Sequence, residues 1–112
     1  VHGEKTQELP NIKAIMDIAD NKSVVVCWNS NDEDLLGGGL TYNFNLVKNR
    51  LGDTVHVREL NIGNYPYQEL MTLFVKMNYS GWIRLECRTD PKDKVKAMRE
   101  QREIFTRMIS TS

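Results

Sequence analysis

Apolar residues recur along this chain in two alternating patterns, one typical of helices and one typical of strands. Four segments carry apolar residues at every third or fourth position, as amphipathic helices do: 11–19, 40–51, 67–78 and 95–109. The last helix is expected to begin at Pro91, with Asp90 as its N-cap. Three short runs rich in β-branched residues stand between the four segments, at 24–28, 54–58 and 82–86. Helices that alternate with strands in this way predict βαβ units built on a parallel sheet.

The expected strands differ in how their polar residues are placed. The first, Val24–Trp28, is apolar throughout, which indicates burial on both faces. In the second strand, Val55 and Val57 alternate with His56 and Arg58, so we expect the valines against the helices and the polar pair on the other face. A three-stranded parallel sheet would leave apolar edge strands unpaired. We therefore predict an α/β fold in which residues 1–112 are a single partial domain, the C-terminal half of a (β/α)₈ TIM barrel.

Polar residues converge on the carboxyl ends of these strands, where parallel α/β folds place their chemistry. Asn29, Arg58 and Glu86 end the three strands, and His56 and Arg84 share the same face. Two simpler interpretations stay open. Arg84 and Glu86 can form a structural ion pair, and His56 can be a hydrogen-bonded core histidine.

Three other features have structural explanations that are simpler than functional ones. The acidic run Asp32–Asp34 is expected to be a solvated loop, not a cation site. The run Gly37–Gly39 lacks the surroundings of a phosphate-binding motif and is expected to give loop flexibility. Trp28 and Trp82 are expected to pack, although Trp28, next to Asn29, is kept as a candidate substrate-binding residue.

Composition excludes some partners. Lys and Arg total 15 and Asp and Glu total 15, so the chain lacks the basic excess of nucleic-acid-binding proteins. Its apolar runs are too short to span a bilayer, and we expect no membrane partner. Cys27 and Cys87 have no metal-type spacing, which indicates reduced thiols and a cytoplasmic protein. The chain begins with Val1, so we expect either a processed N-terminus or a longer chain that was cut.

Three stretches together resemble the last strands of xylose isomerase-like TIM barrels. They are VVVCWNSNDEDLLGGG at 24–39, GDTVHVREL at 52–60 and YPYQELMTLFVKMNYSGWIRLE at 65–86. The most specific element is Gly-Trp-x-x-x-Glu at 81–86, and Val1-His2-Gly3 resembles the tail of a preceding strand. That superfamily contains sugar isomerases, sugar-phosphate epimerases, inosose dehydratase and endonuclease IV.

The resemblance implies a metal site that this chain fills only in part. Members of the family hold a divalent metal, typically Mg, Mn or Zn, with Glu, Asp, His and Glu from four successive strands. Glu86 matches the last of these ligands, but Asn29 stands where the Asp stands and Arg58 where the His stands. The remaining Glu would precede Val1. Because asparagine is neutral and arginine repels a cation, we expect no metal cofactor in this chain, with Glu86 the one candidate ligand.

The resemblance also implies a function in carbohydrate metabolism. We expect a sugar or sugar-phosphate isomerase/epimerase-like protein, with Glu86, Arg58 and His56 catalytic and with Asn29, Arg84 and Trp28 contacting the substrate. The fragment itself is expected to be inactive and to self-associate or to pack on a missing N-terminal barrel half.

The alternative is a non-catalytic barrel member that binds a sugar-like or anionic ligand, or a partner chain. In that case Arg58 and Arg84 receive a carboxylate or phosphate, or Arg58 simply neutralises Glu86. Endonuclease-type DNA binding is disfavoured by the balanced charge.

Overall fold

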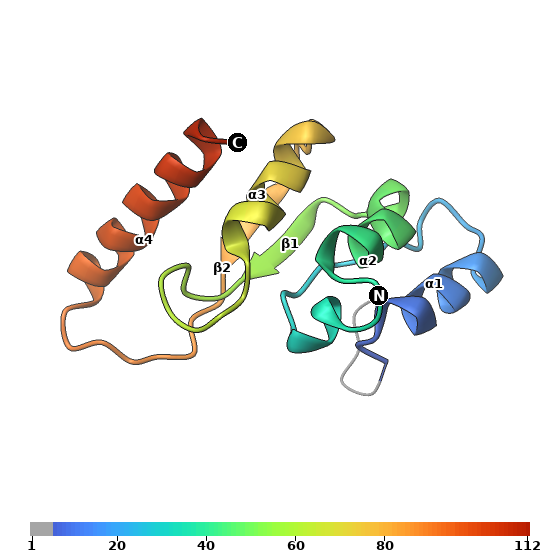
Figure 1. Cartoon of the computed structure of the whole chain (residues 1–112), viewed down its shortest axis with the longest axis horizontal. Coiled ribbons are helices and arrows are strands. Elements are labelled where there is room, and N and C mark those ends of the chain that lie inside the picture. The colour runs from blue at the N-terminus through green and yellow to red at the C-terminus, as the bar shows by residue number, and fades with distance from the viewer. Residues whose placement is uncertain (1–5) are drawn as a thin grey trace.

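The described part of the chain contains four α-helices and a sheet of two adjacent parallel strands (Figure 1). The computed structural model describes residues 6–112, so the strand tail expected at Val1–Gly3 lies outside the described residues. In chain order the elements are α1 (Leu9–Ile18), the 3₁₀ turn η1 (Asp32–Leu35), α2 (Leu40–Val47), the 3₁₀ turn η2 (Lys48–Arg50), β1 (Thr54–Val57), α3 (Tyr67–Lys76), β2 (Trp82–Leu85) and α4 (Lys94–Ser110).

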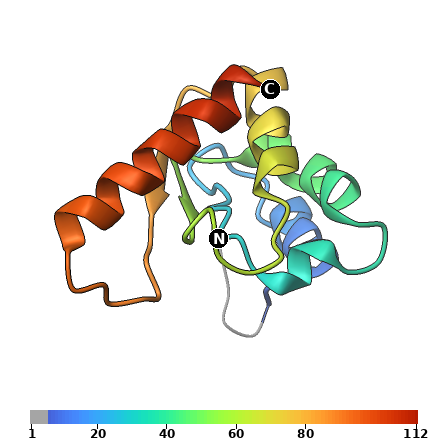
Figure 2. The same cartoon turned by 60° about the vertical axis from the view of Figure 1, so that its left-hand side comes forward.

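Local chemistry accounts for the ends of the outer helices. Pro10 lies in the first turn of α1, where its missing N–H costs no hydrogen bond. Helix α4 begins at Lys94, later than the expected start at Asp90 and Pro91, and its cap is Asp93, whose Oδ1 accepts the N–H of Lys96 at 3.0 Å. The loop between β2 and α4 is therefore longer than the sequence suggested, and it reaches away from the rest of the chain (Figure 2).

One face of the sheet is covered by helices, and the other is open. The register pairs Val55 with Ile83 and Val57 with Leu85, and both valines are buried with residues of α2 and α3. The core continues through edge-to-face aromatic contacts, in which the ring of Phe44 lies 5.3 Å from Trp28 and 5.5 Å from Phe74. Residues of the opposite parity, His56 among them, face away from this core.

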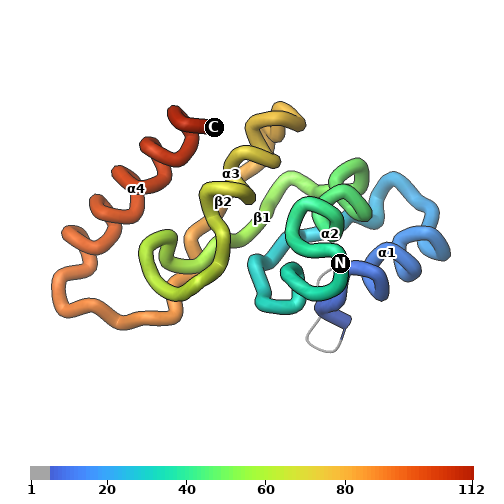
Figure 3. Tube along the Cα trace, viewed as in Figure 1, coloured from blue at the N-terminus to red at the C-terminus, as the bar shows by residue number. Residues whose placement is uncertain are grey.

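The prediction of a half TIM barrel is wrong. Within residues 6–112 the sheet has two strands, and the expected first strand at 24–28 contributes a single parallel bridge between Val26 and Leu51. Helices α1 and α4 lie at opposite ends of the longest axis of the molecule, and α2 and α3 lie between them (Figure 3). The chain does not form a repeated strand-and-helix wall.

The hydrogen bonds show why segment 24–28 does not form a strand. The N–H of Gly52 donates to the carbonyl of Val26 at 2.8 Å, and the N–H of His56 donates to that of Trp28, also at 2.8 Å. Between these two hydrogen bonds the donor moves four residues, from Gly52 to His56, while the acceptor moves only two, from Val26 to Trp28. A regular parallel ladder requires equal steps on both strands. The carbonyl of Gly52 is meanwhile taken by the hydroxyl of Tyr79 at 2.8 Å. The neighbouring segment therefore runs beside β1 without a continuous ladder.

Candidate functional site

Four of the residues predicted from the sequence meet on the open face, at the carboxyl end of the strands. Nδ1 of His56 lies 3.0 Å from Oδ1 of Asn29 and 3.6 Å from Oε2 of Glu86. The same Glu86 oxygen lies 2.9 Å from Nη1 of Arg58. The four side chains come from three separate stretches of chain, so they are brought together by the fold and form one polar cluster, Asn29–His56–Arg58–Glu86.

Backbone contacts hold the strand ends that carry this cluster. The hydroxyl of Ser30 donates to the carbonyl of His56 at 2.8 Å, and Ser30 has a positive φ of 55°, which turns the chain immediately after Asn29. The N–H of Glu86 donates to the carbonyl of Val57 at 2.8 Å and so continues the ladder one residue past β2. The backbone N–H of Arg58 donates to the hydroxyl of Tyr67 at 2.9 Å.

The shortest contact in the cluster is the ion pair between Arg58 and Glu86, at 2.9 Å. Arg58 is mostly buried, with 16% of its side chain exposed, whereas 53% of the Glu86 side chain is exposed. Nη1 of Arg58 also lies 3.4 Å from the carbonyl of Glu86, and Nε of Arg58 is buried with no hydrogen-bond partner among the described residues. Arg58 therefore neutralises Glu86, and a ligand can reach the carboxylate more easily than the guanidinium.

Neither the thiol of Cys27 nor a bound metal ion is well placed to supply the chemistry of this cluster. Sγ of Cys27 lies 3.9 Å from Nδ1 of His56, but burial, with a smaller contribution from Glu86, raises the pKa of Cys27, which keeps the thiol protonated and weakly nucleophilic. A divalent cation would have to displace Arg58 from Glu86 and accept the neutral Asn29 as a ligand. Among residues 6–112 no group of three or more His, Cys, Asp or Glu side chains could hold a metal. That the chain binds none stays a prediction.

Two candidate substrate-binding residues lie outside the cluster. Arg84 pairs with His56 in the register but is exposed, and among the described residues it forms no ion pair with Glu86 or any other acid. Trp28 points to the covered face, is 2% exposed, and donates its indole N–H to the hydroxyl of Tyr65 at 3.3 Å. It packs as the simpler interpretation expected. Trp82 does not pack, since 71% of it is exposed.

Sequence reasoning missed a buried acid in the loop that we expected to be solvated. Asp34 is 3% exposed, and its Oδ2 accepts the N–H of Asn31 at 2.8 Å and the hydroxyl of Tyr65 at 2.6 Å. Burial raises the pKa of Asp34 to about 6, although both hydrogen bonds oppose the shift. The spacing of Asn31 and Asp34 at the start of a helical turn was the available signal, because an acid that caps its own turn need not face solvent.

Comparison of the chain with protein-family models, with curated proteins and with solved structures found no match. The resemblance to xylose isomerase-like proteins therefore rests on the quoted residues alone. In the described part of the chain, no helix combines the length and the apolar character needed to cross a membrane.

Proposed function

We propose that this chain binds a sugar-like molecule at the Asn29–His56–Arg58–Glu86 cluster and isomerises or epimerises that molecule. The observation that carries the proposal is the meeting of Asn29, His56 and Glu86 within 3.6 Å on an open face. An amide, an imidazole and a carboxylate supply both donors and acceptors, which is what recognition of a polyhydroxylated ligand requires. The proposed setting is the reducing cytoplasm, in keeping with the free thiols of Cys27 and Cys87.

The chemistry assigns a role to each residue. Isomerisation and epimerisation by proton transfer both remove a proton from a carbon next to the sugar carbonyl, and the electron pair passes to the carbonyl oxygen as an enediolate forms. A proton returns to carbon afterwards, and a base within hydrogen-bond reach carries the proton. Glu86 is the accessible carboxylate and takes the proton. His56, 3.6 Å away, is the acid–base partner that serves the substrate oxygen. Asn29 orients the His56 ring through the 3.0 Å contact, and Arg58 holds the Glu86 carboxylate in place.

A second function, binding without catalysis, is favoured by the Arg58–Glu86 ion pair. The pair commits the one carboxylate of the cluster to a guanidinium 2.9 Å away, and a permanently paired acid is a poor proton carrier. In this alternative the exposed Arg84 and the remaining hydrogen-bonding groups hold a sugar-like or anionic ligand that leaves unchanged.

Deuterium incorporation distinguishes the two functions. The chain is incubated in D₂O with aldopentoses, ketohexoses and their phosphates, and the recovered sugars are analysed by mass spectrometry and NMR. Catalysis gives deuterium at a C–H position, and Glu86→Gln abolishes it. Binding alone gives shifts in the amide signals of Asn29, His56 and Glu86 without exchange. The matched control is Glu100→Gln, an exposed acid on α4, which should change neither result. Absence of both signals with every sugar would refute the proposal.

Self-association of the chain stays a prediction, which light scattering on the purified 112-residue chain checks. Packing on an N-terminal barrel half has lost its basis, because the described residues do not form a half barrel.

A further inference from the structure

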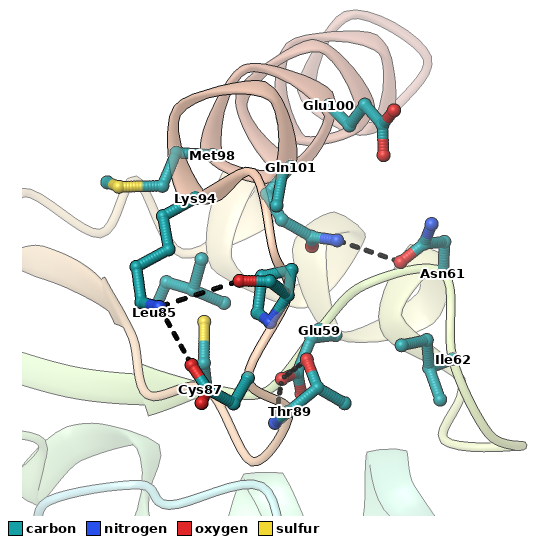
Figure 4. A pocket seen from close by; sticks show the side chains of 13 residues that line it. Glu59, Asn61, Ile62, Leu85, Cys87, Thr89, Lys94, Met98, Glu100 and Gln101 are labelled. Carbon is teal, nitrogen blue, oxygen red and sulfur yellow. Dashed lines mark hydrogen bonds and ion pairs between the residues drawn. The ribbon is translucent and has the colours of Figure 1, made fainter.

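A cavity of about 320 Å³ lies between the loop that follows β2 and the first turns of α4 (Figure 4). Sites that bind small molecules have volumes of about 300–1,000 Å³, so the cavity is large enough for a small ligand. Its apolar walls come from three parts of the chain, with Leu85 from β2, Ile62 from the loop after β1, and Ala97 and Met98 from α4. Leu85 belongs to the covered face of the sheet, so this cavity is separate from the polar cluster on the open face.

A buried carboxylate lines one side of the cavity. Glu59 is 6% exposed, and its Oε1 accepts the backbone N–H groups of Arg88 at 2.7 Å and Thr89 at 2.9 Å and the Thr89 hydroxyl at 2.9 Å. Burial pushes the pKa of Glu59 upward, but the hydrogen bonds from Thr89 and Arg88 outweigh it and lower that pKa to about 2. Glu59 therefore carries a full negative charge at neutral pH.

In the part of the chain that the structure describes, no cationic side chain lies within ion-pair distance of the Glu59 carboxylate. The one ammonium that lines the cavity, that of Lys94, is paired with Asp90 at 2.9 Å (Figure 4). Glu100 adds a further acid at the rim. The partial positive charge at the start of α4 is met by Asp93, whose side chain caps the helix.

Apolar walls beside a negative charge that no ion pair among the described residues neutralises favour one class of ligand. The Glu59 carboxylate is stabilised by its hydrogen bonds but keeps its full charge, which attracts a cation across a short, poorly solvated distance, and the walls gain from contact with an apolar body. A carboxylate or phosphate ligand would instead meet Glu59 and Glu100 with like charge. We propose that this cavity binds a small organic cation, a primary ammonium group on an aromatic or branched aliphatic body.

The walls are held in position before any ligand arrives. Oε1 of Gln101 accepts the N–H of Leu60 at 2.7 Å, and its Nε2 donates to Oδ1 of Asn61 at 2.8 Å, which ties α4 to the loop after β1. Glu59 fixes the opposite loop through Arg88 and Thr89. Two fixed walls reduce the ordering cost that a ligand meets on binding.

Three probes of similar shape and different charge test the proposal: phenethylamine, 2-phenylethanol and 3-phenylpropionate. Each is titrated into the ¹⁵N-labelled chain, and amide shifts are followed by NMR. We expect phenethylamine to shift the amide signals of Asn61, Thr89 and Ala97. It should bind about tenfold more tightly than the neutral alcohol, because it adds one charge-assisted contact that the alcohol cannot make. The propionate should bind more weakly still. Equal binding of all three, shifts confined to other parts of the chain, or no binding would overturn the proposal.

Variants separate the contribution of charge from that of shape. Ala97→Leu fills the cavity from α4 and should abolish binding of both phenethylamine and the alcohol. Glu100→Gln should weaken phenethylamine about twofold to threefold, as loss of an exposed charge does, and leave the alcohol unchanged. Glu103→Gln is the matched control, because it is an exposed acid on the same helix that does not line the cavity. Equal effects of Glu100→Gln and Glu103→Gln would overturn the assigned position of the cation.

Discussion

The hydroxyl of Tyr65 donates a hydrogen bond of 2.6 Å to Oδ2 of Asp34, and so joins the loop after β1 to the turn before α2. The indole N–H of Trp28 donates to the same hydroxyl at 3.3 Å. Burial, together with the neighbouring Asp34 carboxylate, raises the pKa of Tyr65, so the phenol stays a donor. A chain of two hydrogen bonds therefore links the buried Trp28 to the Asp34 carboxyl through the Tyr65 hydroxyl.

The raised pKa of Asp34 predicts a loss of stability as pH rises through 6. In the unfolded chain this carboxyl ionises near 3.8, and in the folded chain near 6. Its contribution is complete below the unfolded value and is lost as pH rises through the folded one. The free energy of unfolding should fall by about 3 kcal/mol at most across this window. Urea denaturation between pH 4 and 7 measures it.

Asp34→Asn should remove this pH dependence, because the amide keeps an acceptor for Tyr65 and cannot ionise. Asp32→Asn, an exposed neighbour in the same turn whose charge contributes least to the raised pKa of Asp34, is the matched control and should keep most of the slope. If Asp34→Asn retained the slope between pH 4 and 6, the assignment of the buried acid would be wrong.

The lowered pKa of Glu59 predicts that the free energy of unfolding falls as the solution becomes more acidic. This pKa is lowered from 4.5 to about 2, so the contribution of Glu59 is present above 4.5 and is lost as pH falls toward 2. Glu59→Gln should lower the free energy of unfolding at pH 7 by about 1.5–3 kcal/mol, the range for hydrogen bonds to a charged group. Amide hydrogen exchange at Arg88 and Thr89 should accelerate in this variant. Unchanged protection at both amides would show that the loop does not depend on Glu59.

Replacing Arg50 with lysine, which keeps the positive charge, should lower the free energy of unfolding. The Arg50 guanidinium donates to four backbone carbonyls that surround the end of α1, with distances of 2.9–3.2 Å, namely those of Met16, Ala19, Asn21 and Val24. An ammonium cannot reach them all from one position. We expect Arg50→Lys to cost about 1–3 kcal/mol of stability, because carbonyls that are mostly part-buried lose their donors.

The control for Arg50→Lys is Asp20→Asn. The ion pair between Asp20 and Arg50 is 3.9 Å long and the Asp20 side chain is almost fully exposed, so its loss should cost less than about 0.5 kcal/mol. Thermal and chemical denaturation of both variants provide the comparison. Similar losses in the two would mean that charge, not the fork of donors, anchors α1.

The close packing around Gly81 predicts that adding even one methyl group there destabilises the fold. A Cβ at this position would collide with the ring and hydroxyl of Tyr79 and lie 2.7 Å from the carbonyl of Asp53, and the Tyr79 hydroxyl donates to Gly52. Gly81→Ala should therefore cost more than Tyr79→Phe, which removes only the hydrogen bond, worth about 1 kcal/mol. The free energies of unfolding of the two variants check this. A Gly81→Ala chain as stable as the unmodified one would contradict the packing described for Tyr79.

Local patterns in the sequence predicted the elements whose signals are local. The alternation of Val55, His56 and Val57 indicated a strand with one buried and one polar face, and the structure confirms both the strand and its parallel pairing with β2. The same parity argument placed His56, Asn29 and Glu86 on one face, and the structure brings them within 3.6 Å. Parity is a property of consecutive residues, so the sequence carries it completely.

The tertiary structure alone decided which of these elements became a sheet and which acids became buried. Val24–Trp28 reads as a buried strand, but its ladder depends on residues far along the chain, where Tyr79 takes the Gly52 carbonyl and the pairing shifts beside β1. The sequence pattern indicates that Asp34 is a loop acid, but the hydroxyl of Tyr65, 31 positions further along the chain, donates a hydrogen bond to it and the carboxylate is buried. The amino-acid sequence by itself determined the helices and the polar and apolar faces of the strands, because neighbours in the chain set these; the fold then brought the polar cluster together from three separate stretches. The sequence did not determine sheet closure or burial of charge, because both depend on hydrogen-bond partners that only the folded chain brings together.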